Sequence, residues 1–263
     1  MSPMPRETLV AIADELAAAE RGRTTVPLLT ARHPGMTVDD AYAVQGEWRR
    51  RAVANGRRPV GHKIGLTSKV MQVATGIDEP DYGAIFDDMV YASGAVVEHG
   101  RFSSVRVEVE LAFRLAEPLE GPGVTLADVL RATEHVVPAL EILSSRIELE
   151  GRTIVDTISD NAAMGAMVVG DTSARPDDVD LPWVAAVLRR NGVIEESGVA
   201  SAVLGHPATG VAWLANKLAQ HGDHLAAGEL VLAGSFTRPI WVQPGDTLLA
   251  DYRDLGTITC RFT

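Results

Sequence analysis

Residues 105–115 read VRVEVELAFRL, and this stretch decides the fold class. Its odd-numbered positions are all apolar, whereas most of its even-numbered positions carry a charge, which is the pattern of a β-strand with two different faces. Glu108 and Glu110 fall on the same face. Their Cα atoms are then ~6.5–7 Å apart, so both carboxylates can reach one cation. The stretch predicts a strand that directs two acids to one side, although a solvated outer face is the common alternative.

A third acid favours a cation site over the solvated outer face. Residues 136–143, VVPALEIL, are apolar except for Glu141, so this carboxylate lies in a run that should be buried. A buried acid is costly unless it is paired or bound to a metal. Three carboxylates suit a hard divalent ion such as Mg2+ or Mn2+. The sequence therefore predicts a metal site made by Glu108, Glu110 and Glu141.

Around this core the chain divides into two parts. Residues 1–58 hold nine Arg and seven acidic residues, whereas residues 59–263 hold 15 Lys and Arg against 28 acidic residues. The first part shows helical spacing and a capping box at Thr37 and Asp40, so we predict a helical N-terminal segment over 1–58. Residues 59–263 show short Val, Ile and Leu runs between Gly, Pro and Asp, which predicts a sheet-rich second domain. The fold class expected is α+β.

Composition excludes several classes of protein. The chain of 263 residues has a net charge of -11, the wrong sign for binding nucleic acid through its phosphates. No apolar run is long enough for a membrane span, and the start lacks the pattern of a secretory signal, so we expect a cytoplasmic protein. The single Cys260 allows no internal disulfide, and no Cys/His zinc spacing occurs.

Further polar residues are candidates for chemistry. Lys63 lies between glycines in an apolar strand, where burial would lower its pKa towards the general acid/base range, unless it reaches the surface. Ser159 opens a polar cluster that is either a helix cap or a substrate clamp. Residues 234–239, GSFTRP, form a turn that can offer backbone N–H groups and an Arg to a carboxylate, or simply a loop.

Several strings, in order along the chain, resemble one family. They are GHKIGLTSKVMQ (61–72), IDEPDYG (77–83), VEVELAF (107–113), PALEIL (138–143), DTISDNAA (156–163), NGVIEE (191–196), HPATGVAWLANKLA (206–219), GSFTRP (234–239) and LGTITCRF (255–262). Together they resemble the 2-keto-4-pentenoate hydratase branch of the fumarylacetoacetase superfamily. The resemblance implies a mixed, rolled β-sheet with flanking helices, bound Mg2+ or Mn2+, and a homo-oligomer, with a pentamer or decamer as candidates. Association with a neighbouring pathway enzyme is a further possibility.

The resemblance also assigns residues. It maps the metal ligands onto Glu108, Glu110 and Glu141, the acids that the strand pattern had marked. It gives Lys63, Asp81 and Ser159 catalytic positions around the substrate. The polar turn 234–239 itself makes Ser235, Thr237 and Arg238 candidates for substrate binding. Two features depart from the family pattern: His62 replaces an aromatic residue before the Lys, and the segment from Glu141 to Ser159 is short.

The activity implied is hydration of a 2-hydroxydienoate or 2-oxo-enoate in aromatic meta-cleavage catabolism. The expected substrate is 2-oxohept-4-ene-1,7-dioate, which becomes 4-hydroxy-2-oxoheptane-1,7-dioate. Hydration of 2-oxopent-4-enoate and decarboxylation of 4-oxalocrotonate are the alternatives, because all three reactions can use the same metal ligands. A non-catalytic partner subunit is the remaining class, although no ligand acid is missing.

A dioate carries a second carboxylate that the metal does not reach, and a chain of net charge -11 repels it unless a local cation binds it. Arg238 is the predicted cation because it lies in the polar turn. Arg106 and Arg146 are rivals beside the ligand strands.

Overall fold

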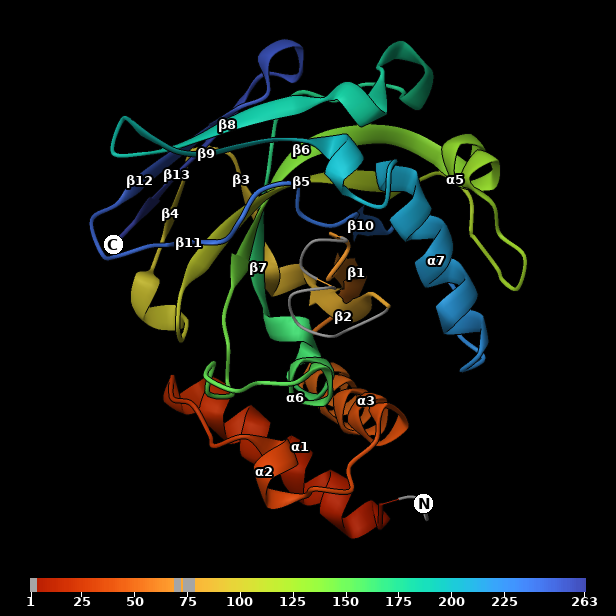
Figure 1. Ribbon diagram of the computed structural model, residues 1–263, viewed down its shortest axis with the longest axis vertical. Coiled ribbons are helices and arrows are strands. Elements are labelled where there is room, and N and C mark those ends of the chain that lie inside the picture. The colour runs from red at the N-terminus through yellow and green to blue at the C-terminus, as the bar shows by residue number, and fades with distance from the viewer. Residues whose placement is uncertain (1–3, 69–71, 73–78) are drawn as a thin grey trace.

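The computed structural model describes residues 4–68, 72 and 79–263, and this part of the chain forms two mixed β-sheets with helices around them (Figure 1). Parts of two motifs, residues 69–71 and 77–78, lie outside the described residues. The α-helices of the described part are α1 (Arg6–Gly22), α2 (Leu29–Arg32), α3 (Val38–Ala54), α5 (Leu126–Ala132), α6 (Ile154–Ser159) and α7 (Pro207–Ala219). Its 3-10 helices are η1 (Asp87–Met89), η2 (His99–Arg101), η3 (Asn161–Ala163), η4 (Pro176–Asp178), η5 (Leu181–Trp183), η6 (Ala200–Ala202) and η7 (Arg253–Leu255).

Two sheets contain the strands. The first has the order β2 (Asp81–Phe86), β1 (Pro59–Gly65), β10 (Leu230–Leu232), β5 (Arg106–Leu115), β6 (Thr133–Leu143), β7 (Met164–Val169) and β3 (Val90–Ala92), with β11 (Ile240–Trp241) paired to β5. The second has the order β4 (Ala95–Val97), β13 (Thr257–Phe262), β12 (Thr247–Asp251), β8 (Ala185–Arg190) and β9 (Val193–Val199). The pairs β1–β10, β3–β7 and β4–β13 are parallel, whereas the other pairs are antiparallel.

The α+β fold class predicted from the sequence is confirmed. The expected rolled sheet is divided into two mixed sheets. Strands β3 and β4 follow each other after only Ser93 and Gly94, yet they belong to different sheets. The chain therefore turns from one sheet into the other at this point, which gives the bent arrangement seen in Figure 1.

Strand β5 lies inside the first sheet, hydrogen-bonded to β10 and β11 on one side and to β6 on the other. The apolar side chains at its odd positions, from Val107 to Leu115, are at most 1% exposed. They belong to the main hydrophobic core, which confirms the alternation read from the sequence. Burial of one face fixes the register, because a shift by one residue would bring the charged face into the core.

Local sequence signals set the ends of several elements. The predicted capping box at Thr37 and Asp40 begins α3, and equivalent boxes begin α5 and α6. Asn191 and Gly192 both have positive φ and join β8 to β9, as a type I′ hairpin turn requires. Pro207 occupies the first turn of α7, where its missing N–H costs nothing.

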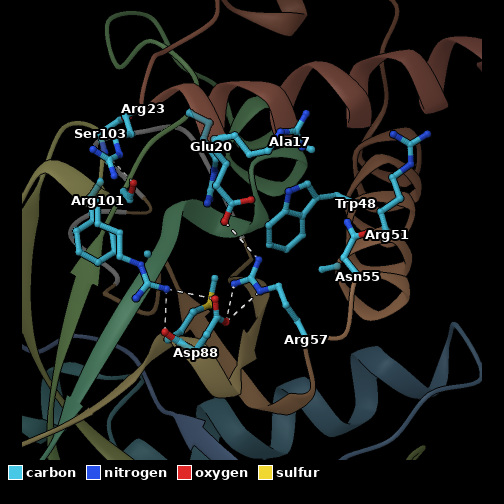
Figure 2. Close-up of a pocket in the computed structure, with 17 residues that line it drawn as sticks. Ala17, Glu20, Arg23, Trp48, Arg51, Asn55, Arg57, Asp88, Arg101 and Ser103 are labelled. Atoms are coloured by element: carbon cyan, nitrogen blue, oxygen red, sulfur yellow. Dashed lines mark hydrogen bonds and ion pairs between the residues drawn. The ribbon is translucent and has the colours of Figure 1, made fainter. Parts of the chain in front are cut away.

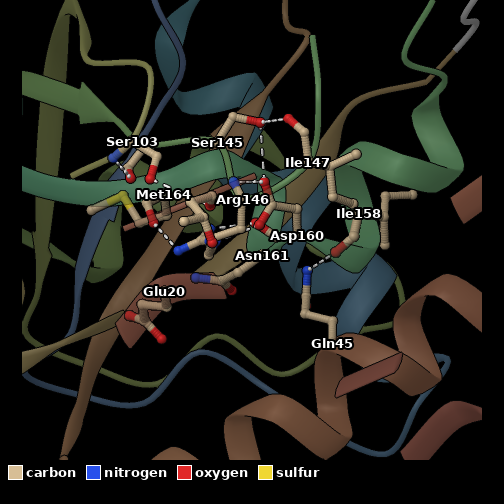
Figure 3. Close-up of polar contacts among 12 residues, drawn as sticks. Glu20, Gln45, Ser103, Ser145, Arg146, Ile147, Ile158, Asp160, Asn161 and Met164 are labelled. Atoms are coloured by element: carbon tan, nitrogen blue, oxygen red, sulfur yellow. Dashed lines mark hydrogen bonds and ion pairs between the residues drawn. The ribbon is translucent and has the colours of Figure 1, made fainter. Parts of the chain in front are cut away.

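The N-terminal helices α1, α2 and α3 lie at one end of the molecule, the lower end in Figure 1, where α3 packs against both α1 and α6. Gln45 on α3 is buried, and its Nε2 donates to the carbonyl oxygen of Tyr82 at 2.8 Å. It also donates to that of Ile158 at 2.9 Å (Figure 3). These hydrogen bonds tie the helical segment to β2 and α6. The division of the chain into two domains at residue 58 stays a prediction.

A cavity of about 360 Å³ lies between these helices and the first sheet (Figure 2). Several arginines line it, but the central ones are paired. Arg57 forms ion pairs with Glu20 and Asp88, and Arg101 binds the same Asp88. Ion pairs around this cavity therefore join the N-terminal helices to the sheet.

Arg146 and Asp160 form a buried ion pair next to this cavity (Figure 3). The Arg146 side chain also donates to the carbonyl oxygens of Met164 and Asp160. Both side chains are nearly inaccessible to solvent. The pair fixes the segment between β6 and β7.

Among the described residues, no helix has the length and apolar character needed to cross a bilayer.

Candidate metal and substrate site

Three glutamates from β5 and β6 converge on one point of the first sheet. Glu108 lies directly opposite Glu141 in the antiparallel register, and Glu110 follows on the same face of β5. One carboxylate oxygen from each residue lies within 4.8 Å of the other two. Glu110 and Glu141 are buried, whereas Glu108 is partly exposed. The structure thus brings together the three acids that the sequence marked as metal ligands.

The electrostatics of this cluster fit a cation. Burial, and then the Glu141 charge, raise the pKa of Glu108 to about 8. Burial and the two neighbouring acids raise the pKa of Glu110 well above its usual value, and burial also raises the pKa of Glu141. Glu110 Oε1 is buried and has no hydrogen-bond partner among the residues that the structure describes, while its Oε2 accepts from the Gly234 amide at 2.9 Å. Three crowded carboxylates with a free oxygen fit a hard divalent ion.

Lys63 extends from β1 into the same cluster. Its Nζ lies 3.2 Å from Glu141 Oε1, and the side chain is buried. The expectation that burial lowers its pKa is wrong in this arrangement. Burial does oppose the charge, but Glu141, Asp81 and further acids outweigh it, so the pKa of Lys63 is raised. Lys63 therefore remains a protonated ammonium group beside the acids.

Asp81 begins β2, directly opposite Gly65 of β1. Both of its carboxylate oxygens are buried without a hydrogen-bond partner of standard geometry in the described part of the chain, although the nearby Gly65 amide favours the ionised form. Burial nevertheless raises the pKa of Asp81, and Lys63 only partly opposes this. A side chain at position 65 would collide with Asp81 Oδ1, so this close approach requires glycine.

A cavity of about 410 Å³ opens onto these groups. Its walls come from β1, β5, the segment after β6, the end of β9 and the turn 234–239. The cavity contacts Lys63, Asp81, Glu108 and Glu110, so it is the place where a substrate would meet both the acids and the lysine.

The turn 234–239 borders this cavity, but its polar side chains are already engaged. Ser235 Oγ donates to the Val109 or Thr237 carbonyl oxygen, and Thr237 Oγ1 accepts from the Val109 amide at 3.1 Å. Both hydroxyl groups therefore fasten the turn to β5. The Arg238 side chain is 80% exposed and binds Glu196 at 2.7 Å. The structure places Ser235, Thr237 and Arg238 at the cavity without leaving the arginine free.

Ser159 does not lie at the cavity. It is the last residue of α6, is buried, and its Oγ donates to the Val155 carbonyl oxygen at 2.8 Å. The geometry gives no support to a substrate contact by Ser159. Of the cluster that begins at Ser159, Asp160 binds Arg146, and Asn161 holds the backbone of Ala84. Each member has a structural task.

Two residues that line the cavity were not predicted from the sequence as the main substrate-binding residues. Arg106 was only a rival for binding the distal carboxylate, yet it lines the cavity on the strand face of Glu108. Arg152 had no signal at all, because it lies in the irregular segment between β6 and α6. The other rival, Arg146, points away into its pair with Asp160.

Tyr252 connects the second sheet to this site. Its hydroxyl group lies 2.8 Å from the Glu110 carbonyl oxygen and 2.6 Å from that of Ala139, and donates its one hydrogen to either. These two residues face each other on β5 and β6. The residue that follows β12 thus contacts the backbone of both ligand strands.

Comparisons with known proteins point to one family. Residues 56–263 match the family model described as fumarylacetoacetate (FAA) hydrolase C-terminal. The chain is 51% identical over 263 residues to the 2-oxo-hept-4-ene-1,7-dioate hydratase of Escherichia coli, covering 98% of each chain. It is 37% identical to the 4-oxalocrotonate decarboxylase of Pseudomonas sp. strain CF600, again over 98% of each. The 4-oxalocrotonate decarboxylase of Pseudomonas putida G7, solved with magnesium and adipate, superposes with a TM-score of 0.97 at 36% identity over the full length of both chains.

Proposed function

Because this chain belongs to the fumarylacetoacetate hydrolase C-terminal family, we propose that it is a divalent-metal-dependent hydratase of 2-oxo-enoates, with 2-oxohept-4-ene-1,7-dioate as substrate. The observation that carries the proposal is a cavity lined by Lys63, Asp81 and two of the three convergent glutamates, Glu108 and Glu110. The 51% identity over nearly the whole length of a hydratase for that dioate supports the choice of substrate.

Glu108, Glu110 and Glu141 would hold Mg2+ or Mn2+. When bound, such an ion supplies a positive charge that stabilises an enolate at C2 of a 2-oxo acid. The related decarboxylase was solved with magnesium, which supports this choice of ion. Glu110 is held in place by the Gly234 amide, so its free oxygen stays directed at the cluster.

The residues beside the acids supply the proton transfers. We assign to Asp81 the removal of a proton from C3 and its return at C5, because burial brings the pKa of this carboxyl towards the range of a proton carrier. The result is a conjugated 2-oxo-3-enoate. Water then adds its oxygen to C4, and a proton reaches C3, which gives the 4-hydroxy-2-oxo acid. Lys63, which keeps its proton, orients the water and offsets the charge of Asp81.

Decarboxylation of 4-oxalocrotonate is the second candidate function. The observation in its favour is the TM-score of 0.97 to a decarboxylase over the full chain. Both reactions use an enolate at C2, so the acids alone do not separate them. The higher identity to the hydratase, 51% against 37%, favours hydration.

One assay separates the candidates. Purified protein with Mg2+ is supplied in turn with the dienol forms of 2-oxohept-4-ene-1,7-dioate and 2-oxopent-4-enoate, and with 4-oxalocrotonate. We expect loss of the dienol absorbance and a 4-hydroxy-2-oxo dioate by mass spectrometry. Release of CO2 from 4-oxalocrotonate at the higher kcat/KM would instead identify a decarboxylase. No turnover of any of the three would contradict the proposal, and Glu110→Gln serves as the inactive control.

We also propose a homo-oligomer. Large apolar side chains are exposed on strands of the second sheet and on β11, with Val193 64%, Ile194 56% and Trp241 51% exposed. Exposed apolar groups of this kind are typical of protein interfaces. Light scattering coupled to gel filtration measures the mass, for which a pentamer or decamer is expected and a monomer would be contradictory.

The free buried Cys260 agrees with a cytoplasmic location, which cell fractionation would test. Association with a neighbouring pathway enzyme stays a prediction.

A further inference from the structure

Arg106 has unused hydrogen-bond donors inside the substrate cavity. It is the first residue of β5, and its guanidinium lies over the Trp241 ring, 5.5 Å from the centroid. Its Nε and Nη2 atoms are buried and have no hydrogen-bond partner among the described residues. Leaving buried charged donors unpaired is expensive, so their persistence indicates a group that arrives from outside.

A second guanidinium faces the same space. Arg152 lines the cavity, and its Nη1 donates to Ser145 Oγ at 3.1 Å. It lies near enough to Arg106 for the two positive charges to repel each other. Two like charges at one cavity wall are unfavourable unless an anion lies between them or beside them.

The acids near Arg106 do not fill this need. Glu108 and Glu141 are the acids whose charges act on it, but both belong to the cluster that would hold the metal. A divalent ion on these carboxylates takes up their charge. Arg106 and Arg152 then remain as cations with donors available, and the cavity combines a cation-binding wall with an anion-binding wall.

We propose that Arg106, assisted by Arg152, binds the distal carboxylate of a dicarboxylic substrate and so selects dioates over monoacids. This inference rests on the proposed function, because it takes the metal-binding 2-oxo acid end as given. On an extended strand, Arg106 and Glu108 are separated by two residues, or ~7 Å. The carbon chain from C2 to C7 of the dioate spans about 6 Å with bonds near 1.5 Å, so the two ends of the substrate match the two walls.

The two other arginines considered from the sequence do not compete. Arg238 is mostly exposed and already bound to Glu196. Arg146 is buried in its pair with Asp160, away from the cavity. The sequence-based assignment of the distal carboxylate to Arg238 is therefore replaced by Arg106.

The test uses two stable ligands that differ only at the far end, 2-oxoheptanedioate and 2-oxoheptanoate. Their dissociation constants are measured by calorimetry with saturating Mg2+, so no turnover is needed. Arg106→Met keeps the length of the apolar stem but removes the charge. A charged hydrogen bond predicts a loss of about 10- to 100-fold in affinity for the dioate, with less than about 3-fold change for the monoacid. Arg106→Lys, which keeps the charge without the planar fork, should restore part of the loss.

Arg32→Met, which breaks an exposed pair with Glu15 away from the cavity, is the matched control and should leave both affinities unchanged. If Arg106→Met fails to fold, as judged by its melting curve, Arg152→Met replaces it and should weaken dioate binding by several-fold. Unchanged dioate affinity would overturn the inference. Equal losses for dioate and monoacid would also overturn it, because they would assign Arg106 to the 2-oxo acid end. Selective dioate binding without hydratase turnover would instead refute the proposed function while leaving the anion subsite intact.

Discussion

Metal binding at the three glutamates should release protons and therefore strengthen with pH. A cation binds the ionised carboxylate, but the metal-free cluster favours protonated carboxyls, with the pKa of Glu108 raised to about 8. At pH 7 only about one tenth of such a group is ionised, and at pH 9 about nine tenths is. The apparent affinity for Mg2+ should thus rise about tenfold from pH 7 to pH 9 through Glu108 alone. Glu110, with a pKa further raised, adds to the same trend.

Titration calorimetry measures this effect directly. Experiments at pH 7 in two buffers with different ionisation enthalpies should report close to one proton, or more, released for each ion bound. Asp87→Asn is the matched control, because this acid is half-buried, has a lowered pKa and pairs with Arg58 outside the cavity. Its pH dependence should equal that of the wild type. An Mg2+ affinity that stays constant between pH 6 and 9 would refute the electrostatic account of the cluster.

Three further predictions follow from the same geometry. Glu110→Gln should weaken Mg2+ binding by at least tenfold, because it removes a charged ligand, and calorimetry that finds wild-type affinity would contradict its role. Lys63→Met should fold but lower kcat by ~10²–10⁴, and unchanged turnover would show that the buried ammonium is only structural. Arg146→Met should cost about 3–5 kcal/mol, since it leaves a buried acid unpaired, and so lower Tm by roughly 6–20 °C. Arg32→Met, which breaks an exposed pair with Glu15, should cost at most about 1 kcal/mol, and equal melting shifts in the two variants would contradict the burial argument.

The strand pattern predicted the acid cluster because period-two alternation determines which side chains share a face. Residues 105–115 and the isolated Glu141 needed no knowledge of the rest of the fold. The capping box at Thr37 and Asp40 was equally local, so the structure reproduces it.

Features that depend on distant partners were not predictable in this way. The pKa of Lys63 is set by acids on three other strands, which outweigh its burial. Arg238 finds Glu196, 42 positions away, only because β9 passes beside the turn. Ser159 turns towards Val155 because its position at the end of α6 directs it back along the helix. Each of these results needs tertiary structure.

Because Glu108 and Glu141 face each other, the acid cluster forms only when β5 and β6 pair in the native register. A one-residue slip between β5 and β6 would turn one of these acids to the opposite face, so a mispaired chain would lack the ion site altogether. An ion that binds only the native pairing draws the folding equilibrium towards it by mass action. If the glutamates hold an ion as proposed, a chelator would therefore lower the free energy of unfolding of this protein as well as its activity.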